Sequence, residues 1–413
     1  MKALTRVGQT LLAPVLAVLI ALVISAAVML AIGVDPFRAL EVMVDFGDTP
    51  SQQTTAIVVV LNRAVPLFLA GLAVAVAFRM GLFNIGVEGQ YRMATVLAAG
   101  AGAAVSLPAP LHVLVIIVVA MLVGAVWAGI VAVLKVTRGV SEVISSIMLN
   151  FIALGLASFL LTGPLRGSEP GASIITTEEI PESGWFPSLN GVFGAIGLAD
   201  PPRQLYGFLL VALVVGVVVA VVIKRTRFGF DLRATGLSAS AASASGVNAR
   251  RMVLTTMLLS GATAGLIGLP DLLGSNHTYG TEFTSGLGFL GIAVALLGRN
   301  NPLGIAIAAV LFAFLDRAAV PLQIAGIPSS VVTIIQGTIV LAVVVANEVS
   351  RRITRRQAES GSAVAPPSTG DGSTGGGQGP DGGPPPDGPV GTGPALTNAT
   401  GAAGRTSPTG STS

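Results

Sequence analysis

Residues 224–251 read KRTRFGFDLRATGLSASAASASGVNARR, a polar and basic stretch between two apolar ones. Its six Lys/Arg and single Asp cannot lie in hydrocarbon, and the excess of positive charge predicts a position on the cytoplasmic side of a membrane. Within it, residues 238–245 contain only Ser and Ala and are followed by Gly246, which predicts a short helix with a glycine stop. The small side chains favour a docking element for another protein. A plain basic loop between two helices is the alternative.

The composition is that of an integral membrane protein. Of 413 residues, 52% are hydrophobic and 10% are charged, and the mean hydropathy is +0.81. The chain has no cysteine, which excludes disulfides and cysteine-ligated metal sites, and His112 and His277 are too far apart in the sequence for a metal-binding motif. The net charge of +3 comes mostly from Lys/Arg at the ends of apolar segments, so neither nucleic-acid binding nor a bound cofactor is expected.

Ten apolar segments are candidates for membrane spans, and we predict an all-α integral membrane protein. The expected architecture is a polytopic helical bundle of about ten transmembrane helices with both termini cytoplasmic. All but six of the 23 Lys/Arg then lie on the cytoplasmic side, as the positive-inside rule requires. The third and eighth segments are the ones expected to be re-entrant or broken. The segments cover approximately residues 11–34, 56–78, 79–100, 111–134, 141–162, 205–223, 252–273, 286–298, 303–320 and 331–346.

The composition also divides the chain into two parts. Residues 1–350 form the predicted transmembrane domain, which contains the loop 224–251. Residues 351–413 are first basic and then rich in Gly, Pro, Ser and Thr, which predicts a disordered cytoplasmic tail. Residues 163–204 are the longest outside segment, expected to be a compact loop, and they are either a connector or a contact surface for a soluble partner.

Several polar residues interrupt the apolar segments. Glu88 and Arg92 are four residues apart, so they share a helical face and can neutralise each other. Ionisable groups at membrane depth usually face the interior of a bundle or a water-filled path. The pair is therefore either a structural salt bridge or part of a translocation path. In another segment, Glu142 and Asn150 lie two helical turns apart on nearly the same face.

Charged residues near the outer ends of the later spans have a simpler interpretation. Asp271, Asp316 and Arg317 are each predicted to lie at the membrane interface. The outside histidine, His277, is expected to be incidental.

Two motifs resemble those of a known family. The stretches GLFNIGVEGQ (residues 81–90) and SEVISSIMLNFIA (residues 141–153) together resemble the membrane subunits of bacterial ABC importers for nucleosides. The wider family is of the branched-chain amino acid and ribose permease type. Residues 236–246 resemble the cytoplasmic coupling motif of ABC-importer permeases, G-x-N-x-E-A-A-x-x-x-G, with Ser238 where Asn is common and Ser240 where an acid is common.

The resemblance implies a permease subunit that provides the translocation path for nucleosides and is coupled to a separate ATPase. The implied partners are a cytoplasmic ABC ATPase with two nucleotide-binding units, a second related permease and an extracytoplasmic substrate-binding lipoprotein, in the lipid bilayer of a bacterial cell membrane. By position, Asn84, Glu88, Glu142 and Asn150 would line or gate the substrate path. The residues that would contact the ATPase are Gly236, Ser238, Ser240, Ala241, Ala242 and Gly246.

The residues themselves offer no site for ATP hydrolysis. A phosphate-binding loop needs G-x-x-x-x-G-K-[ST], and none of the lysines, Lys2, Lys135 and Lys224, follows a glycine. The chain is therefore expected not to be an enzyme, and a partner would hydrolyse ATP. Two alternatives stay open: an ABC permease for ribose or another simple sugar, and an ion-coupled secondary carrier that uses Glu88 or Glu142 as its coupling acid.

Overall fold

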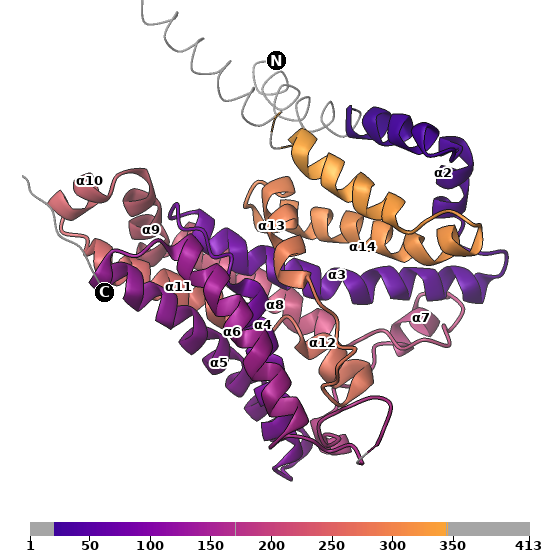
Figure 1. The fold of residues 1–413 in the computed structure, drawn as a ribbon. Coiled ribbons are helices and arrows are strands. Elements are labelled where there is room, and N and C mark those ends of the chain that lie inside the picture. Colours follow the sequence, from indigo (N-terminus) through magenta and orange to yellow (C-terminus); the bar gives the residue numbers. More distant parts are fainter. Residues whose placement is uncertain (1–19, 170, 344, 346–413) are drawn as a thin grey trace, which may run out of the picture. The chain divides into compact units, whose positions relative to one another are not determined.

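A computed structural model describes residues 20–169, 171–343 and 345 of the chain. In these residues the regular structure is helical, with three isolated β-bridges in the outer segments (Figure 1). The predicted tail, residues 351–413, and the start of the first predicted span lie outside the described residues.

Each of the ten predicted spans coincides with a helix or with a part of one. Six helices are long and apolar enough to cross a membrane, and there are seven if the bent pair Ile20–Ala31 and α2 (Pro36–Val44), which meet at 116°, is one span. The six are α3 (Pro50–Phe78), α5 (Ala109–Arg138), α6 (Glu142–Thr162), α8 (Phe208–Arg225), the continuous helix Ala249–Asn276 and α14 (Pro302–Ile324). Ten complete spans and two cytoplasmic termini stay predictions.

The third and eighth predicted spans, which were expected to be re-entrant or broken, are unbroken short helices. They are α4 (Val87–Ala103) and α13 (Leu287–Leu297), of 17 and 11 residues. At 1.5 Å per residue α13 is about 16 Å long, well short of a hydrocarbon core of about 30 Å. The last described helix, Ser330–Val343, is also short.

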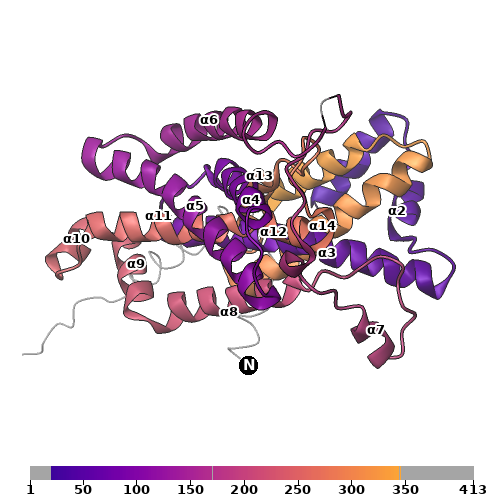
Figure 2. The same cartoon turned by 90° about the horizontal axis from the view of Figure 1, so that it is seen from below.

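The helix α3 lies at the centre of the bundle, packed against α8, α11 (Ala249–Gly265), α13 and α14 (Figure 2). Every residue from Ala64 to Ala77 is buried, which explains why α3 is apolar on all its faces. In contrast, only 22% of the most apolar stretch of α5 and of α6 is buried. The remaining apolar faces of α5 and α6 are exposed on this chain.

Glycines set the contact between α5 and α11. A Cβ at Gly124 of α5 would overlap the Gly261 carbonyl oxygen of α11, and a Cβ at Gly265 would overlap the Ala120 carbonyl oxygen. The two backbones therefore touch directly, a packing that small residues permit inside a membrane.

The long segment that is predicted to lie outside, residues 163–204, is folded against the end of the helix Ala249–Asn276. The Ile180 N–H donates to the His277 carbonyl oxygen, and the Trp185 and His277 rings stack with centroids 3.9 Å apart. Two further short helices, η1 (Glu182–Gly184) and α7 (Gly191–Ala195), lie in this segment. The prediction of a compact loop is confirmed, and His277 is part of its anchor rather than incidental.

Candidate functional site

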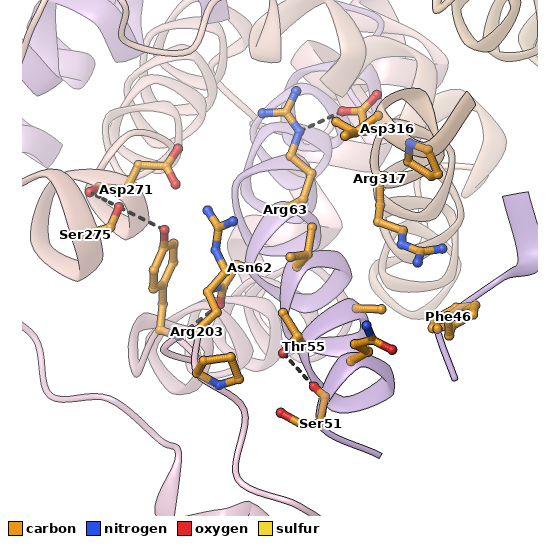
Figure 3. Close-up of a pocket in the computed structure, with 18 of the residues that line it drawn as sticks. Phe46, Ser51, Thr55, Asn62, Arg63, Arg203, Asp271, Ser275, Asp316 and Arg317 are labelled. Atoms are coloured by element: carbon orange, nitrogen blue, oxygen red, sulfur yellow. Dashed lines mark hydrogen bonds and ion pairs between the residues drawn. The ribbon is translucent and has the colours of Figure 1, made fainter. Parts of the chain in front are cut away.

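A polar cavity of about 1030 Å³ lies among α3, α14, the residues before α8 and the end of the helix Ala249–Asn276 (Figure 3). Along α3 its wall runs from the exposed Gln52 to the buried Asn62, so the cavity extends from the start of α3 into the bundle. In the predicted topology the start of α3 is outside. The charged residues that line the cavity are Asp45, Arg63, Arg203, Asp271, Asp316 and Arg317.

An ion pair closes one side of this cavity. Arg63 Nε donates to Asp316 Oδ2 over 2.7 Å, and Gln336 Nε2 donates to Asp316 Oδ1 over 2.7 Å. The Asp316 carboxylate therefore joins α14 to α3 and to the helix Ser330–Val343, contacts that the predicted interfacial role did not include. The sequence did contain a signal for this ion pair: Arg63 and Asp316 are opposite charges within two apolar segments, and each needs a partner at membrane depth.

The neighbouring Arg317 also lies inside the protein fold. Its guanidinium donates to the carbonyl oxygens of Met43 and Asp45 and lies over the Phe46 ring, 4.5 Å from the centroid. Arg317 thereby fixes the connection between α2 and α3 at the rim of the cavity, and an interfacial role alone does not describe it.

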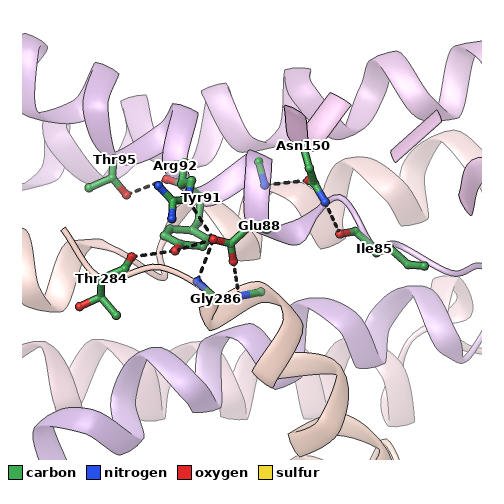
Figure 4. Close-up of polar contacts among 10 residues, drawn as sticks. Ile85, Glu88, Tyr91, Arg92, Thr95, Asn150, Thr284 and Gly286 are labelled. Atoms are coloured by element: carbon green, nitrogen blue, oxygen red, sulfur yellow. Dashed lines mark hydrogen bonds and ion pairs between the residues drawn. The ribbon is translucent and has the colours of Figure 1, made fainter. Parts of the chain in front are cut away.

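A second polar site surrounds the start of α4 (Figure 4). Glu88 Oε1 accepts hydrogen bonds from Arg92 Nε at 2.9 Å and from the Tyr91 hydroxyl at 3.1 Å, so the predicted Glu88–Arg92 pair is confirmed. The same carboxylate accepts the backbone N–H groups of Gly286 and Gly288, at 2.9 and 3.0 Å. Glu88 thus accepts hydrogen bonds from backbone N–H groups at the start of α13, where a helix offers its own N–H groups no acceptor.

Glycine is required where α13 meets Glu88. Gly286 has φ +85°, the left-handed conformation in which a side chain is strained, and a Cβ at Gly288 would overlap the Glu88 backbone. No sequence pattern predicts that the N–H groups of Gly286 and Gly288 bind Glu88, because they lie about 200 residues from it in the chain.

Two asparagines complete the network around the start of α4. Asn150 Oδ1 accepts from the Gly89 N–H at 2.8 Å, and its Nδ2 donates to the Ile85 carbonyl oxygen at 3.0 Å. Asn84 exchanges hydrogen bonds with the Gln90 amide and donates to Ser260 Oγ at 2.8 Å. Three of the four predicted path residues therefore converge here, and they tie α4 to α6, α11 and α13.

The fourth predicted path residue, Glu142, forms a separate ion pair. Its Oε2 lies 2.5 Å from Lys135 Nζ, across the turn between α5 and α6. None of the four predicted residues lines the 1030 Å³ cavity. Their role in lining or gating a path stays a prediction.

We expect Glu142→Gln to have a small effect on stability. The Glu142 side chain is only 10% exposed, but that of Lys135 is 31% exposed, so water still reaches the lysine and the glutamine keeps an acceptor oxygen for it. Partly solvated pairs contribute about 0–1 kcal/mol. The free energy of unfolding of the purified chain in detergent should therefore fall by at most about 1 kcal/mol. Loss of transport at an unchanged amount of protein would contradict this structural role and favour a role for Glu142 as a gate.

The predicted docking segment is helical and extends beyond the neighbouring helices. Residues 227–237 form α9 (Arg227–Leu237), and α10 (Ala239–Ala244) follows, capped by Ser238 Oγ, which accepts from the Ala241 N–H. Gly246 has φ +86°, so the predicted short helix with a glycine stop is confirmed.

The six predicted coupling residues have different positions. Ser240 and Ala241 are exposed, whereas Ala242 is buried. Gly236 lies against the backbone of Arg79 and Met80, where a Cβ would approach the Arg79 carbonyl oxygen to 2.6 Å. This contact joins the end of α9 to the connection between α3 and α4.

Known proteins resemble this chain over most of its length. Residues 56–344 match the family described as "Branched-chain amino acid transport system / permease component". A glucose ABC transporter permease protein of Haloferax volcanii is 36% identical over 79% of this chain and 85% of its own length. A guanosine ABC transporter permease protein of Bacillus subtilis is 36% identical over 81% of this chain and 92% of its own length.

A second guanosine ABC transporter permease protein of Bacillus subtilis is 26% identical over 63% of this chain and 80% of its own length. With the match of residues 56–344 and the two relatives at 36% identity, the chain belongs to the branched-chain amino acid transport system permease family and is the membrane-embedded permease subunit of an ABC transporter.

Proposed function

We propose that the chain imports nucleosides across the cell membrane and that α10 couples it to a cytoplasmic ABC ATPase. The observation that carries the proposal is the exposed Ser/Ala face of α10, together with the contact of Gly236 with Arg79 and Met80. A displacement of α10 would pass through α9 to the segment just before α4. Nucleosides are favoured because the guanosine relative is 36% identical over 92% of its length.

We further propose that the network at the start of α4 forms part of the gate. Asn84, Glu88 and Asn150 hold α4 against α11, α13 and α6, so a movement of the α3–α4 connection reaches all three helices. In this proposal the three side chains position the helices that line the path rather than contact the solute. Glu142 and Lys135 would keep α5 and α6 together during the movement.

The proposed complex contains this permease, a second related permease, an ATPase with two nucleotide-binding units and an extracytoplasmic substrate-binding lipoprotein. The two guanosine permease proteins of Bacillus subtilis support a pair of different permeases. The lipoprotein would dock on the outer segment around residues 163–204, because its anchoring by Ile180 and Trp185 makes it a preformed surface.

Uptake of labelled guanosine tests the proposal. Cells with and without the gene are compared, with ATP supplied by fermentation and the proton gradient removed by an uncoupler. Gene-dependent uptake should survive the uncoupler. Uptake that disappears with the gradient would refute ATP coupling and favour a secondary carrier with Glu88 or Glu142 as the ion-coupling acid.

A simple sugar is the second candidate solute, because the glucose relative is also 36% identical. Unlabelled glucose and ribose are therefore added as competitors in the same assay. Inhibition by a sugar but not by unlabelled guanosine would reassign the solute and leave the permease mechanism intact.

Docking through α10 predicts a specific loss of coupling. We expect Ala241→Trp to lower uptake by roughly tenfold, the equivalent of about 1.4 kcal/mol, because a bulky side chain on the exposed face holds the ATPase away. The amount of folded permease should not change, and the ATPase should no longer co-purify with it. Ala325→Trp, at a partly exposed alanine just after α14 and outside both α10 and residues 163–204, is the matched control and should keep co-purification and uptake.

A further inference from the structure

The charged residues of the 1030 Å³ cavity balance one another. Three aspartates and three arginines line it, so the lining carries no net charge. A cavity with balanced charges favours a neutral solute that offers several hydrogen-bonding groups over a phosphorylated one. Its volume is ample for a nucleoside, since ligand pockets usually measure about 300–1,000 Å³.

Most polar groups of the lining already have partners within the protein. Arg63 Nε and both Asp316 carboxylate oxygens are engaged, and the Asn62 amide spans the Gln204 carbonyl oxygen and the Tyr206 N–H. The Tyr206 hydroxyl donates to Ser275 Oγ at 2.9 Å. These hydrogen bonds hold the side chains of the wall in place and do not cross the centre of the cavity.

Asp271 is different. It follows α11 in the helix Ala249–Asn276 and is only partly exposed, yet no hydrogen bond to its carboxylate occurs within residues 20–169, 171–343 and 345. Figure 3 shows its carboxylate facing the same space as the guanidinium groups of Arg63 and Arg203. Among the described residues the Arg203 side chain also makes no hydrogen bond, and the Arg63 side chain donates hydrogen bonds only through Nε.

We infer that Asp271, with Arg63 and Arg203, binds the hydroxyl groups of a neutral polyhydroxylated solute, such as the ribose of a nucleoside, in this cavity. The inference rests on the proposed import function and adds the residues that recognise the solute. A carboxylate has two acceptor oxygens and can accept hydrogen bonds from two adjacent hydroxyls, whereas the guanidinium groups donate to the ring or base oxygens. Because the cavity opens at the start of α3, the solute would enter from the predicted outside.

The test compares Asp271→Asn with the wild-type chain in cells that contain the whole transporter. Uptake of labelled guanosine should fall about tenfold or more, because the variant loses a charge-assisted acceptor. Uptake of labelled 2′,3′-dideoxyguanosine, which lacks the adjacent 2′- and 3′-hydroxyls of the ribose, should change less than about twofold. The binding lipoprotein is the same in every arm, so the ratio of the two effects isolates the contribution of Asp271. If glucose is the solute taken up, glucose and a deoxyglucose replace the two nucleosides.

A matched control and a second measurement keep the result interpretable. Asp35→Asn changes a carboxylate outside the cavity whose Oδ1 already accepts from the Phe37 N–H, and it should leave both uptakes near wild type. Since the chain has no cysteine, Ser275→Cys places a single thiol in the cavity. In membrane vesicles of the whole transporter, guanosine should slow alkylation of this thiol and should not slow alkylation of a thiol from Ser188→Cys, which lies outside the cavity.

Three outcomes are separable. Equal losses of guanosine and dideoxyguanosine uptake, or unchanged uptake of both, would overturn the inference while the proposed function stands. Failure of guanosine to slow the alkylation of Ser275→Cys would also overturn it. A wild-type chain that supports uptake of neither guanosine nor glucose would refute the proposed function itself.

Discussion

Replacing Gly265 by leucine is expected to prevent the permease from accumulating. A Cβ at this position overlaps the Ala120 carbonyl oxygen and comes within 2.7 Å of the Ala120 carbonyl carbon. Both atoms belong to the α5 backbone, so no side-chain rotation relieves the overlap and the two helices must separate. Overpacking of this kind costs about 3 kcal/mol, the upper end of its usual range, because the opposite contact at Gly124 and Gly261 is lost as well.

The control is the same substitution at Gly155 of α6, where no atom lies within 4 Å of the added Cβ. Helix propensity alone would favour leucine over glycine at both sites by roughly 1 kcal/mol, so propensity cannot separate the two variants. We expect Gly155→Leu to reach wild-type levels in the membrane, and Gly265→Leu to fall below about a tenth of that level, measured by immunoblot of membrane fractions. Equal amounts of the two variants would contradict the direct backbone contact between α5 and α11.

Local sequence patterns were sufficient for the positions of the apolar helices and of α10. Apolar length placed the spans, the run of Ser and Ala before Gly246 placed α10, and the spacing of four residues placed Arg92 beside Glu88. Each of these features depends on residues that are close in the chain. The hydrogen-bonding and steric rules that govern them act over one or two helical turns.

Partners that are distant in the chain could not be predicted in this way. Arg63 and Asp316 are 253 residues apart, and their ion pair exists only because α3 and α14 lie side by side. The sequence showed that each charge needed a partner and did not show which one. For the same reason the candidate cavity, which combines residues from four separate segments, was missed, and the predicted path residues were drawn from motifs instead.

Removing the Glu88 carboxylate is expected to destabilise the bundle strongly. In Glu88→Ala three donors lose their acceptor: Arg92 Nε and the N–H groups of Gly286 and Gly288. The Tyr91 hydroxyl keeps its other acceptor, the Thr284 carbonyl oxygen at 2.8 Å. Glu88 is 7% exposed, so water replaces few of these bonds and the Arg92 charge is left half-buried without its partner. Breaking a buried pair by removing one member costs about 3–5 kcal/mol.

The expected loss distinguishes a structural hub from a solute contact. Thermal unfolding in detergent is monitored by size-exclusion chromatography. The unfolding temperature of Glu88→Ala should lie well below that of the wild type, and that of Glu142→Gln should lie close to it. Glu88→Gln should be intermediate, because the amide keeps one acceptor oxygen but presents an N–H₂ group to backbone donors. A Glu88→Ala chain that unfolds at the wild-type temperature yet fails to transport would contradict the positioning role. It would instead make Glu88 a residue that contacts the solute or a coupling ion, since only then would its removal affect transport without affecting the packing of α4 against α13.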